Sequence, residues 1–351
     1  MGWDNDRARR EFVWLKLMSR FKYDGYHDFV AGMRFVESLA SWIQQFLPSE
    51  RESAYAFLRS RMVYVGTAEM NHLVDQAYPE TIRRCLVRAV AQRYGVPTYR
   101  VWATPDATRA YNRLLRQTLF MGLSDGARID VFRRSNAGIV SNEQVVVGMQ
   151  IADEKWTDLL ATLQKDVHPT AKFAYVYLLD DFVGSGKTLL RKDGKSWKGK
   201  LLKFWDNVKT RISTHFEDDW VLCVHHYLAS HQASKGVRDT EAEIRAARAA
   251  RWFQHVEFSF GTILPSSLPI DRTRDPNLMA LIDKYYDDAL ETEHTSVGGG
   301  DVRLGFGGCA LPLVLEHNTP NNSIALLWAE TRGLNGKHSM RPLFRRRQRH
   351  T

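Results

Sequence analysis

The residues with the clearest potential for chemistry lie in one segment, AYVYLLDDFVGSGKTLL, at positions 174–190. Its end, GSGKT, is typical of the P-loop that binds nucleotide phosphates. The same segment also contains two adjacent carboxylates, Asp180 and Asp181, which a P-loop does not need. The sequence therefore has to be tested against more than one phosphate-binding chemistry.

The P-loop interpretation fails at one position. When Gly186, Lys187 and Thr188 are aligned to the end of the motif G-x-x-x-x-G-K-[ST], Asp181 occupies the place of the first glycine. That glycine permits a tight turn, and a carboxylate there would direct negative charge toward triphosphate oxygens. An ATP- or GTP-hydrolysing P-loop protein is thus the least favoured of the functions considered.

The segment resembles a different signature, the phosphoribosyl diphosphate (PRPP) motif of the type I phosphoribosyltransferases, in which D-D-x-x-x-[ST]-G-x-[ST] follows an apolar strand. The resemblance implies that Asp180 and Asp181 accept hydrogen bonds from the ribose hydroxyls and help to hold Mg²⁺. It also implies a 5′-phosphate bound at the N-terminus of the next helix. The phosphate-binding residues would be Val183, Gly184, Ser185, Gly186, Lys187 and Thr188. An acidic turn followed by a glycine-rich helix cap is the alternative.

The wider chain is similar to phosphoribosyltransferase-like proteins of bacterial conflict and anti-phage loci, including some retron systems. Four stretches carry this resemblance, namely 124–136, 141–147, 178–188 and 316–328, and it covers roughly residues 60–330. It implies a parallel sheet of about five strands with helices on both sides. It also implies an Mg²⁺-dependent pentosyl transfer that displaces pyrophosphate from C1 of PRPP. A module that binds PRPP or a nucleotide without catalysis is the alternative.

Other polar residues are candidates for the remaining parts of such a site. The resemblance implies basic groups on the leaving pyrophosphate, and Arg128, Arg133 and Arg134 are the candidates. GLSDG (122–126) is a possible substitute for the usual glycine-rich pyrophosphate loop. The candidates for binding the acceptor are Asn142, Glu143, Gln144, His317, Asn318, Asn321 and Asn322. Helix capping is the alternative for the first three, and an Asn-rich turn for the other four.

The elements that must position these residues follow an alternating order, which predicts parallel βαβ units. Strands are expected at 61–66, in ARIDVFRRSN (127–136), and at 172–181, 220–229 and 255–264. Helices are expected over much of 7–60, and at 67–95, 153–164, 187–191, 198–212, 240–252 and 276–290, with a capping box at Thr240 and Glu243. The fold class is therefore α/β, a twisted parallel sheet of the type I phosphoribosyltransferase kind with flanking helices. The loop after 172–181 should lie at the carboxyl edge of the sheet, where open α/β folds bind ligands.

Three regions are expected along the chain. Residues 1–60 form a helical region that serves as a hood or a docking surface, residues 61–330 form the α/β domain, and residues 331–351 form a basic tail. The net charge of +9 favours anionic partners, such as a nucleic acid, or a defence-system protein that contacts the basic surface and tail.

The cysteine spacing and the lengths of the apolar runs indicate where in the cell the protein is expected. Cys85, Cys223 and Cys309 are far apart and show no CxxC spacing, so neither a disulfide framework nor a zinc site is expected. Apart from Mg²⁺, brought by PRPP or held by Asp180 and Asp181, no metal site is expected. No apolar run approaches the roughly 18–20 residues of a membrane span, and the polar N-terminus is unlike a signal peptide. We expect a cytoplasmic protein with no membrane partner.

Overall fold

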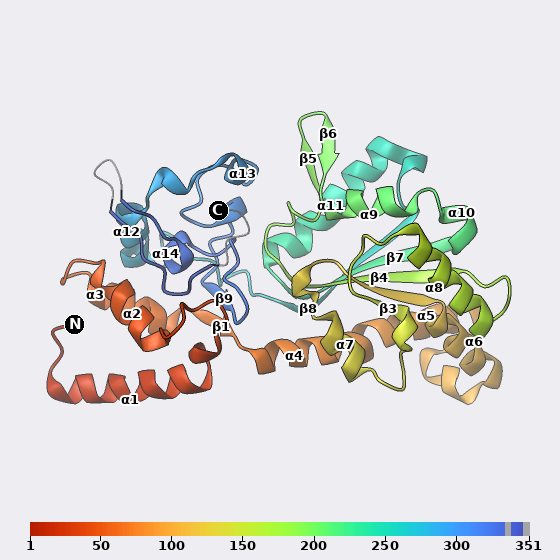
Figure 1. Cartoon of the computed structure of the whole chain (residues 1–351), viewed down its shortest axis with the longest axis horizontal. Helices are drawn as coiled ribbons and strands as arrows, with labels where there is room; N and C mark the ends of the chain where they lie inside the picture. The colour runs from red at the N-terminus through yellow and green to blue at the C-terminus, as the bar shows by residue number, and fades with distance from the viewer. Residues whose placement is uncertain (334–337, 347–351) are drawn as a thin grey trace. The chain divides into compact units, whose positions relative to one another are not determined.

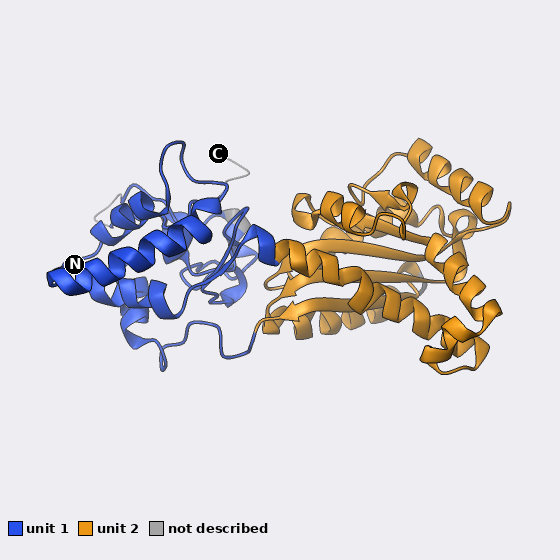
Figure 2. Cartoon of the chain, turned by 90° about the horizontal axis from the view of Figure 1, so that it is seen from below, with its two compact units in different colours: residues 1–69, 265–351 blue, residues 70–264 orange. Residues whose placement is uncertain are grey.

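The chain folds into two compact units. The computed structural model describes residues 1–333 and 338–346. Unit 1 comprises residues 1–69 and 265–351, and unit 2 comprises residues 70–264 (Figure 2). These divisions differ from those expected at residues 60 and 330, because a strand near the N-terminus pairs with one near the C-terminus. Residues 334–337 and 347–351 of the expected basic tail lie outside the described residues.

Unit 2 is built on a five-stranded sheet in the order β3-β2-β4-β7-β8, in which every pair of neighbours is parallel (Figure 1). The strands are β2 (Thr118–Gly122), β3 (Val145–Val146), β4 (Phe173–Val183), β7 (Phe216–Ala229) and β8 (His255–Ile263). The α/β class, the parallel sheet and the central position of the apolar run at 172–181 are thereby confirmed.

Alternation along β4 divides the hydrophobic core between the two faces of the sheet. Val176 and Leu178 pack with Leu222 and Val224 of β7 on one face. Helices α8 (Asp153–Asp166), α9 (Lys200–Val208) and α11 (His231–Arg248) cover this face with Trp156, Leu159, Leu163, Leu201, Phe204, Val208, Val237 and Ile244. Because successive side chains of a strand point to opposite sides, Tyr177 belongs to the other face.

A long helical run, together with two shorter helices, accompanies the second face. The run consists of α4 (Thr67–Gln76), a π-helical turn η2 (Ala77–Ile82) and α5 (Arg83–Tyr94), which ends at Gly95 with φ of 61°. Pro79 lies in the π-helical turn, and its missing N–H accounts for the local change of the hydrogen-bond pattern. The shorter helices are α6 (Pro105–Arg116) and α7 (Ile129–Ser135). Phe132 of α7 contacts Phe120 of β2, with ring centroids 5.1 Å apart.

Unit 1 is mostly helical and has its own core. Its elements are α1 (Asn5–Phe21), α2 (Phe35–Gln44), α3 (Arg51–Ser60), β1 (Val63–Val65), α12 (Pro276–Tyr285), α13 (Glu293–Ser296), β9 (Leu313–Leu315) and α14 (Ala325–Trp328). The expected strand at 61–66 exists, but it pairs in parallel with β9 in a separate two-stranded sheet. Trp42, Phe46 and Phe344 are among the buried aromatic residues of this core.

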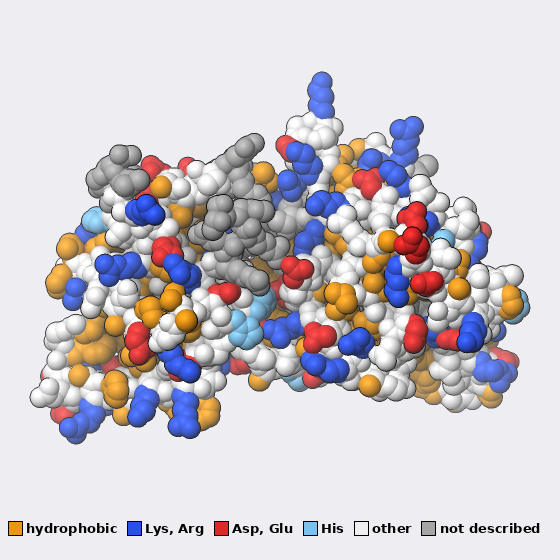
Figure 3. Space-filling model, in the orientation of Figure 1, with side chains coloured by type: hydrophobic (Ala, Val, Ile, Leu, Met, Phe, Trp, Pro, Cys, Tyr) orange, Lys and Arg blue, Asp and Glu red, His pale blue; other side chains and the backbone are white. Residues whose placement is uncertain are grey.

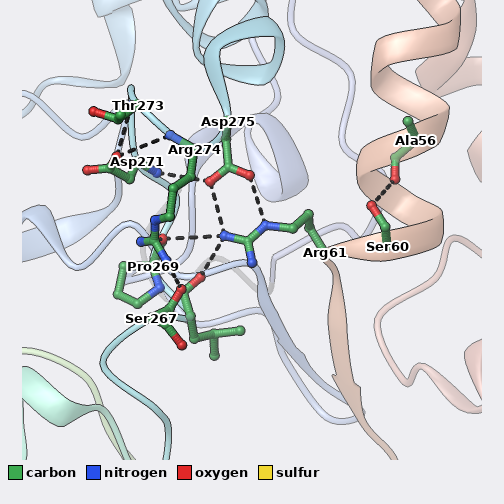
Figure 4. Close-up of polar contacts among 10 residues, drawn as sticks. Ala56, Ser60, Arg61, Ser267, Pro269, Asp271, Thr273, Arg274 and Asp275 are labelled. Carbon is green, nitrogen blue, oxygen red and sulfur yellow. Dashed lines mark hydrogen bonds and ion pairs between the residues drawn. The ribbon is translucent and has the colours of Figure 1, made fainter.

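An ion pair links the start of β1 to the segment that leads into α12. The Arg61 guanidinium donates through Nε and Nη2 to the two carboxylate oxygens of Asp275, at 2.9 and 3.0 Å (Figure 4). The same nitrogen Nη2 lies 3.3 Å from the carbonyl oxygen of Leu268. Asp275 also accepts a hydrogen bond from the amide of Asp271 at 3.1 Å. These contacts hold two segments that lie more than 200 positions apart in the sequence.

Three of the expected elements are wrong. ARIDVFRRSN contributes α7 rather than a strand, and the strand of this region is the preceding TLFMG, β2. Residues 187–191 form no helix; a turn leads instead into an antiparallel hairpin of β5 (Arg191–Asp193) and β6 (Ser196–Lys198). Thr240 is no N-cap, because α11 begins at His231, where Ser230 caps it by accepting from the amide of Ala233.

None of the described helices combines the length and the apolar character needed to cross a membrane.

A further short helix of unit 2, α10 (Ile212–His215), directly precedes β7.

We expect Val176→Ala to lower the free energy of unfolding of unit 2 by about 2 kcal/mol, because two buried methyl groups are lost from a fully covered position on the central strand. Val147→Ala is the matched control, since the Val147 side chain is 79% exposed and should change stability by less than about 0.5 kcal/mol. Hydrogen exchange of β4 amides reports on unit 2 directly. Equal effects of the two substitutions would contradict the burial of β4.

Candidate functional site

The candidate site lies at the carboxyl end of β4. The strand does not stop before the two aspartates but continues through them to Val183. Asp180 and Asp181 are therefore successive strand residues and point to opposite faces of the sheet. The sequence motif predicts a pair of equivalent carboxylates, whereas the fold gives each of them a different environment.

Asp180 lies on the face covered by α9 and is buried, with 3% of its surface exposed. Ser124 Oγ and the amide of Asp181 donate to its Oδ1, the latter at 3.2 Å. Lys200 Nζ, at the first position of α9, lies 2.9 Å from its Oδ2. Burial raises the pKa of Asp180 to about 6, an effect that the positive charge of Lys200 opposes. Both oxygens of this carboxylate are therefore engaged by the protein itself.

Asp181 lies on the other face and is partly exposed. Its Oδ1 accepts a hydrogen bond from the amide of Phe182 at 2.7 Å. The loop after β2 packs against this carboxylate so closely that a Cβ atom on Gly126 would lie 2.5 Å from Asp181 Oδ2. Glycine at position 126 thus allows the two chain segments to approach each other. The predicted pyrophosphate loop, GLSDG (122–126), therefore lies beside the aspartates.

Arg128 follows this loop and is the one arginine among the pyrophosphate candidates that the fold places near Asp181. Its backbone has φ of 46°, an uncommon conformation for a residue with a side chain. Nη1 donates to Asn71 Oδ1 of α4 at 3.2 Å. Burial lowers the pKa of the Arg128 guanidinium, and the charges of Asp181 and Asp130 oppose that shift. The guanidinium is thus held in a fixed place within the field of Asp181.

The other two arginine candidates lie elsewhere. Arg133 and Arg134 are exposed residues in the last turn of α7. Arg134 pairs with Asp130 at 2.9 Å on the surface of that helix. Since α7 leads away from the loop at Arg128, the structure does not bring these two arginines to the aspartates.

The glycine-rich loop after β4 is compact. Leu189 and Leu190 each donate from their amides to the carbonyl oxygen of Gly186 at 3.0 Å. Gly186 has φ of 75°, and a Cβ atom there would lie 2.7 Å from Val237 Cγ1 of α11, so both the turn and the packing require glycine. Ser230 Oγ donates to the carbonyl oxygen of Gly184 and ties the loop to the end of β7.

The loop offers main-chain donors to an anion. Within the described parts of the chain, the amides of Ser185, Gly186 and Thr188 donate no hydrogen bond. Ser185 and Lys187 are partly exposed and Thr188 is exposed, whereas Val183 is buried. Backbone N–H groups of this kind, with a nearby ammonium group, are suited to phosphate oxygens.

The expected contribution of a helix N-terminus to this loop is wrong. The loop leads into the β5–β6 hairpin, and α9 begins only after it. Moreover, the first amides of α9, those of Lys200 and Leu201, donate to the carbonyl oxygens of Thr188 and Leu189, each at 3.1 Å. These amides are therefore occupied, and a phosphate on the loop would depend on the loop amides rather than on a helix dipole.

The first set of acceptor candidates supports the fold. Gln144 is buried and donates to the carbonyl oxygens of Leu115 and Thr118 at 2.6 and 2.7 Å. It also closes a capping box with Ser141, and Glu143 accepts from the same Ser141 hydroxyl. Asn142 is exposed in the same turn. Because these residues precede β3, they lie toward the amino edge of the sheet, away from Asp180 and Asp181.

The second set belongs to unit 1. The amide of Asn318 donates to the carbonyl oxygen of Leu315 at 3.1 Å, and His317 Nδ1 lies 3.2 Å from Glu316 Oε1. Asn321 accepts through its carbonyl oxygen from the amide of Phe306, and Asn322 donates from Nδ2 to the carbonyl oxygen of Phe306 at 2.8 Å. These contacts stabilise the turn after β9, which agrees with the alternative interpretation of these residues as an Asn-rich turn. Asp180, Asp181 and the glycine-rich loop all belong to unit 2.

Sequence reasoning missed Lys200 as part of the site. Ser124 and Gly126 belong to GLSDG, which was a candidate loop for pyrophosphate, but their contacts with the two aspartates were not predicted. Lys200 carried no signal in the sequence, because an ion pair across twenty positions depends on the hairpin between them.

The basic residues are dispersed on the visible face of the molecule. Figure 3 shows Lys and Arg side chains over both units on the face drawn, with Asp and Glu side chains among them. A nucleic-acid or defence-protein partner on the basic surface therefore stays a prediction, and two parts of the expected basic tail, 334–337 and 347–351, lie outside the described residues.

Comparison with known proteins adds one finding. The family model described as PRTase-CE matches residues 39–346, which is more than half of the chain and includes the whole of β4 and the loop after it. Neither the curated proteins nor the solved structures gave a match to this chain.

We expect the burial of Asp180 to make the fold less stable as the pH rises from about 4 to about 6. The folded protein keeps the proton up to a pKa of about 6, whereas the unfolded chain loses it near 3.8, so unfolding releases a proton in this window. Asp180→Asn removes this titration. The free energy of unfolding of wild type minus that of the variant should therefore fall across the window and level off above it.

Urea unfolding at a series of pH values measures this difference, with the exposed Asp158→Asn as the matched control. Parallel pH profiles of wild type and Asp180→Asn would show that burial does not dominate the ionisation of Asp180.

Proposed function

The chain belongs to the PRTase-CE family, a phosphoribosyltransferase-like family, and we propose on this basis that it binds PRPP or a related phosphoribosyl ligand at the end of β4. The observation that carries the proposal is the position of Asp181 and the Gly184–Thr188 loop. Asp181 lies near the carboxyl end of the central strand of a parallel sheet, and the loop directly follows that strand, at the edge where open α/β folds bind ligands.

We assign the ribose to Asp181 and the 5′-phosphate to the loop. The partly exposed Asp181 carboxylate is able to accept from the ribose hydroxyls. The amides of Ser185, Gly186 and Thr188 would donate to the phosphate, with Lys187 adding positive charge. The role of Asp180 in this proposal is positioning, because both of its oxygens are already engaged by Ser124, Lys200 and a main-chain amide.

The proposed reaction is pentosyl transfer. A nucleophilic atom of the acceptor forms a bond to C1 of PRPP, and the bond between C1 and the pyrophosphate oxygen breaks, so pyrophosphate leaves with the electron pair. Developing positive charge on the ribose is tolerable near Asp181, and Arg128 is the candidate to bind the departing pyrophosphate. The acceptor is a nucleobase, a nucleotide or a macromolecule, and no residue beside β4 identifies which.

The donor set fits the Mg²⁺ ion that the reaction class uses. Mg²⁺ prefers oxygen ligands and binds through one or two carboxylates together with substrate phosphates. Asp181 is a partly exposed carboxylate, and Asp125 is an exposed one in the neighbouring loop. When bound, the ion would neutralise charge on the pyrophosphate.

Nucleotide hydrolysis of the P-loop type gains no support from the structure. In a P-loop the lysine and the following hydroxyl residue open a helix, and the helix N-terminus receives the phosphates. Here Lys187 and Thr188 lead into a turn and the β5–β6 hairpin. Asp181 occupies the position of the first glycine and is a strand residue.

We expect Asp181→Asn to weaken PRPP binding by about 10- to 100-fold, because hydrogen bonds to a charged carboxylate contribute about 1.5–3 kcal/mol. Isothermal titration calorimetry with PRPP and Mg²⁺ measures the affinity, and phosphorus NMR measures pyrophosphate release. Asp219→Asn is the matched control, since Asp219 is exposed near the amino end of the neighbouring strand β7 and should leave binding unchanged.

The outcomes of this experiment separate the candidate functions. Binding with pyrophosphate release supports a transferase, and binding without release supports a module that senses the ligand or awaits its acceptor. Wild-type protein that fails to bind PRPP at millimolar concentration, or Asp181→Asn protein that binds as well as wild type, would refute the proposal.

We further propose that the protein acts as an effector in bacterial anti-phage defence, a role supported by the family resemblance rather than by the geometry. If the activity at Asp181 causes protection, cells that carry the intact locus with Asp181→Asn should lose protection against phage at equal protein level. Plaque counts measure this, and the Asp219→Asn locus should protect as the wild-type locus does. Full protection by the Asp181→Asn locus would separate the defence role from this site.

A further inference from the structure

A second group of reactive side chains lies on unit 2, on the face of the sheet opposite α9. Cys85 comes from α5, Cys223 from β7 and Glu257 from β8. Cys223 and Glu257 are direct partners in the parallel pairing of β7 with β8, so their side chains point to the same face. Cys85 approaches this pair from the helix above it.

The three ligand atoms are close together. The two thiol sulfurs and a carboxylate oxygen of Glu257 all lie within 4.8 Å of one another, and Cys85 Sγ is 3.8 Å from Glu257 Oε2. Cys223 is buried, Cys85 is partly buried and Glu257 is exposed. Cys223 is thus fixed in the protein interior, whereas Glu257 is accessible to solvent. All three cysteines of the chain are free thiols.

From this donor set we propose that Cys85, Cys223 and Glu257 bind one thiophilic divalent ion of the Zn²⁺ class. Zn²⁺ takes cysteine sulfur at about 2.3 Å and carboxylate oxygen at about 2.0–2.2 Å in tetrahedral geometry. Two sulfurs on such an ion are about 3.8 Å apart, which the present spacing allows. Three protein ligands leave a fourth position for water. Mg²⁺ and Ca²⁺ prefer oxygen donors only and do not suit this site.

Binding of such an ion is coupled to proton release. The ion binds thiolates, so two protons leave the cysteines as it binds.

The ion would join three elements that are not connected locally. It would fix α5 to the neighbouring strands β7 and β8, and it would act as a structural link. The proposal does not depend on PRPP binding, because Cys223 is level with Tyr177 in the pairing of β4 with β7, four residues before Asp181. That separation corresponds to about 13 Å along the strand.

The test uses the full chain, reduced and stripped of metal, titrated with Co²⁺ alone. Co²⁺ reports thiolate ligands through a sulfur-to-metal charge-transfer absorption in the near ultraviolet. We expect one Co²⁺ per chain with this absorption, and Zn²⁺ should displace it. Cys85→Ser should weaken Co²⁺ binding by more than about tenfold, because loss of a group that only supports a metal ligand typically weakens metal binding by about 10- to 100-fold.

Matched variants assign the ligands. Cys309→Ser is the control, since Cys309 is also a buried free thiol but lies in unit 1, and it should leave the absorption unchanged. Glu257→Gln should keep the absorption while lowering the affinity. In wild-type protein, Zn²⁺ should slow alkylation of Cys85 by iodoacetamide, a measurement that needs no variant to fold.

Two results would overturn the proposal: wild-type protein that shows no charge-transfer absorption, or an absorption that Cys85→Ser leaves intact. Asp181→Asn should bind Co²⁺ as wild type does, so failure at this site and failure of the PRPP site are distinguishable.

Discussion

The ion pair between the buried Asp180 carboxylate and the partly exposed Lys200 is the contact on which the geometry of the candidate site depends. It joins the central strand to the first residue of α9, and the same carboxylate accepts from Ser124 in the loop after β2. Breaking one partner of a buried pair leaves an uncompensated charge and typically costs about 3–5 kcal/mol, even where the intact pair contributes little net stability. The pair therefore contributes mainly to structural specificity. The contact with Lys200 fixes the position of the residue that follows the β5–β6 hairpin, and the contact with Ser124 fixes the position of the loop that contains Gly126.

The geometry of β4 gives the two adjacent aspartates, Asp180 and Asp181, different environments and different roles. Because β4 continues to Val183, Asp180 turns toward α9 and becomes part of the protein interior, while Asp181 turns toward Gly126 and Arg128 and keeps contact with solvent. A pair of carboxylates in a motif is easily taken for two copies of one function. Here the period of two along a strand makes one of them a support for the other.

The sequence predicted the elements whose signals are local. The apolar, β-branched run before Asp180 predicted the central strand, and the spacing of the aspartates and glycines predicted the loop after it. The hairpin at 191–198 carried a signal too, since Asp193-Gly194 is a strong turn pair, with Gly194 at φ of 58°, but no element was predicted between the helices expected at 187–191 and 198–212. What could not be predicted depends on long-range contacts. The pairing of β1 with β9 joins positions 250 apart, and nothing in the spacing of Cys85, Cys223 and Glu257 shows that they meet.

These long-range contacts also connect both candidate sites of unit 2 to one helical run, from α4 to α5. The helical run from α4 through the π-helical turn to α5 carries Asn71, which accepts from Arg128, and Cys85, which lies against Cys223 and Glu257. Fourteen residues separate Asn71 from Cys85, or about 20 Å along a helix. Two groups on one helix move together unless the helix bends, and the π-helical turn at Pro79 is the one place between them where the regular hydrogen-bond pattern is interrupted. Fixing α5 to the sheet near Cys85 would therefore restrain Asn71, and with it the Arg128 guanidinium beside Asp181, to the extent that this turn is stiff.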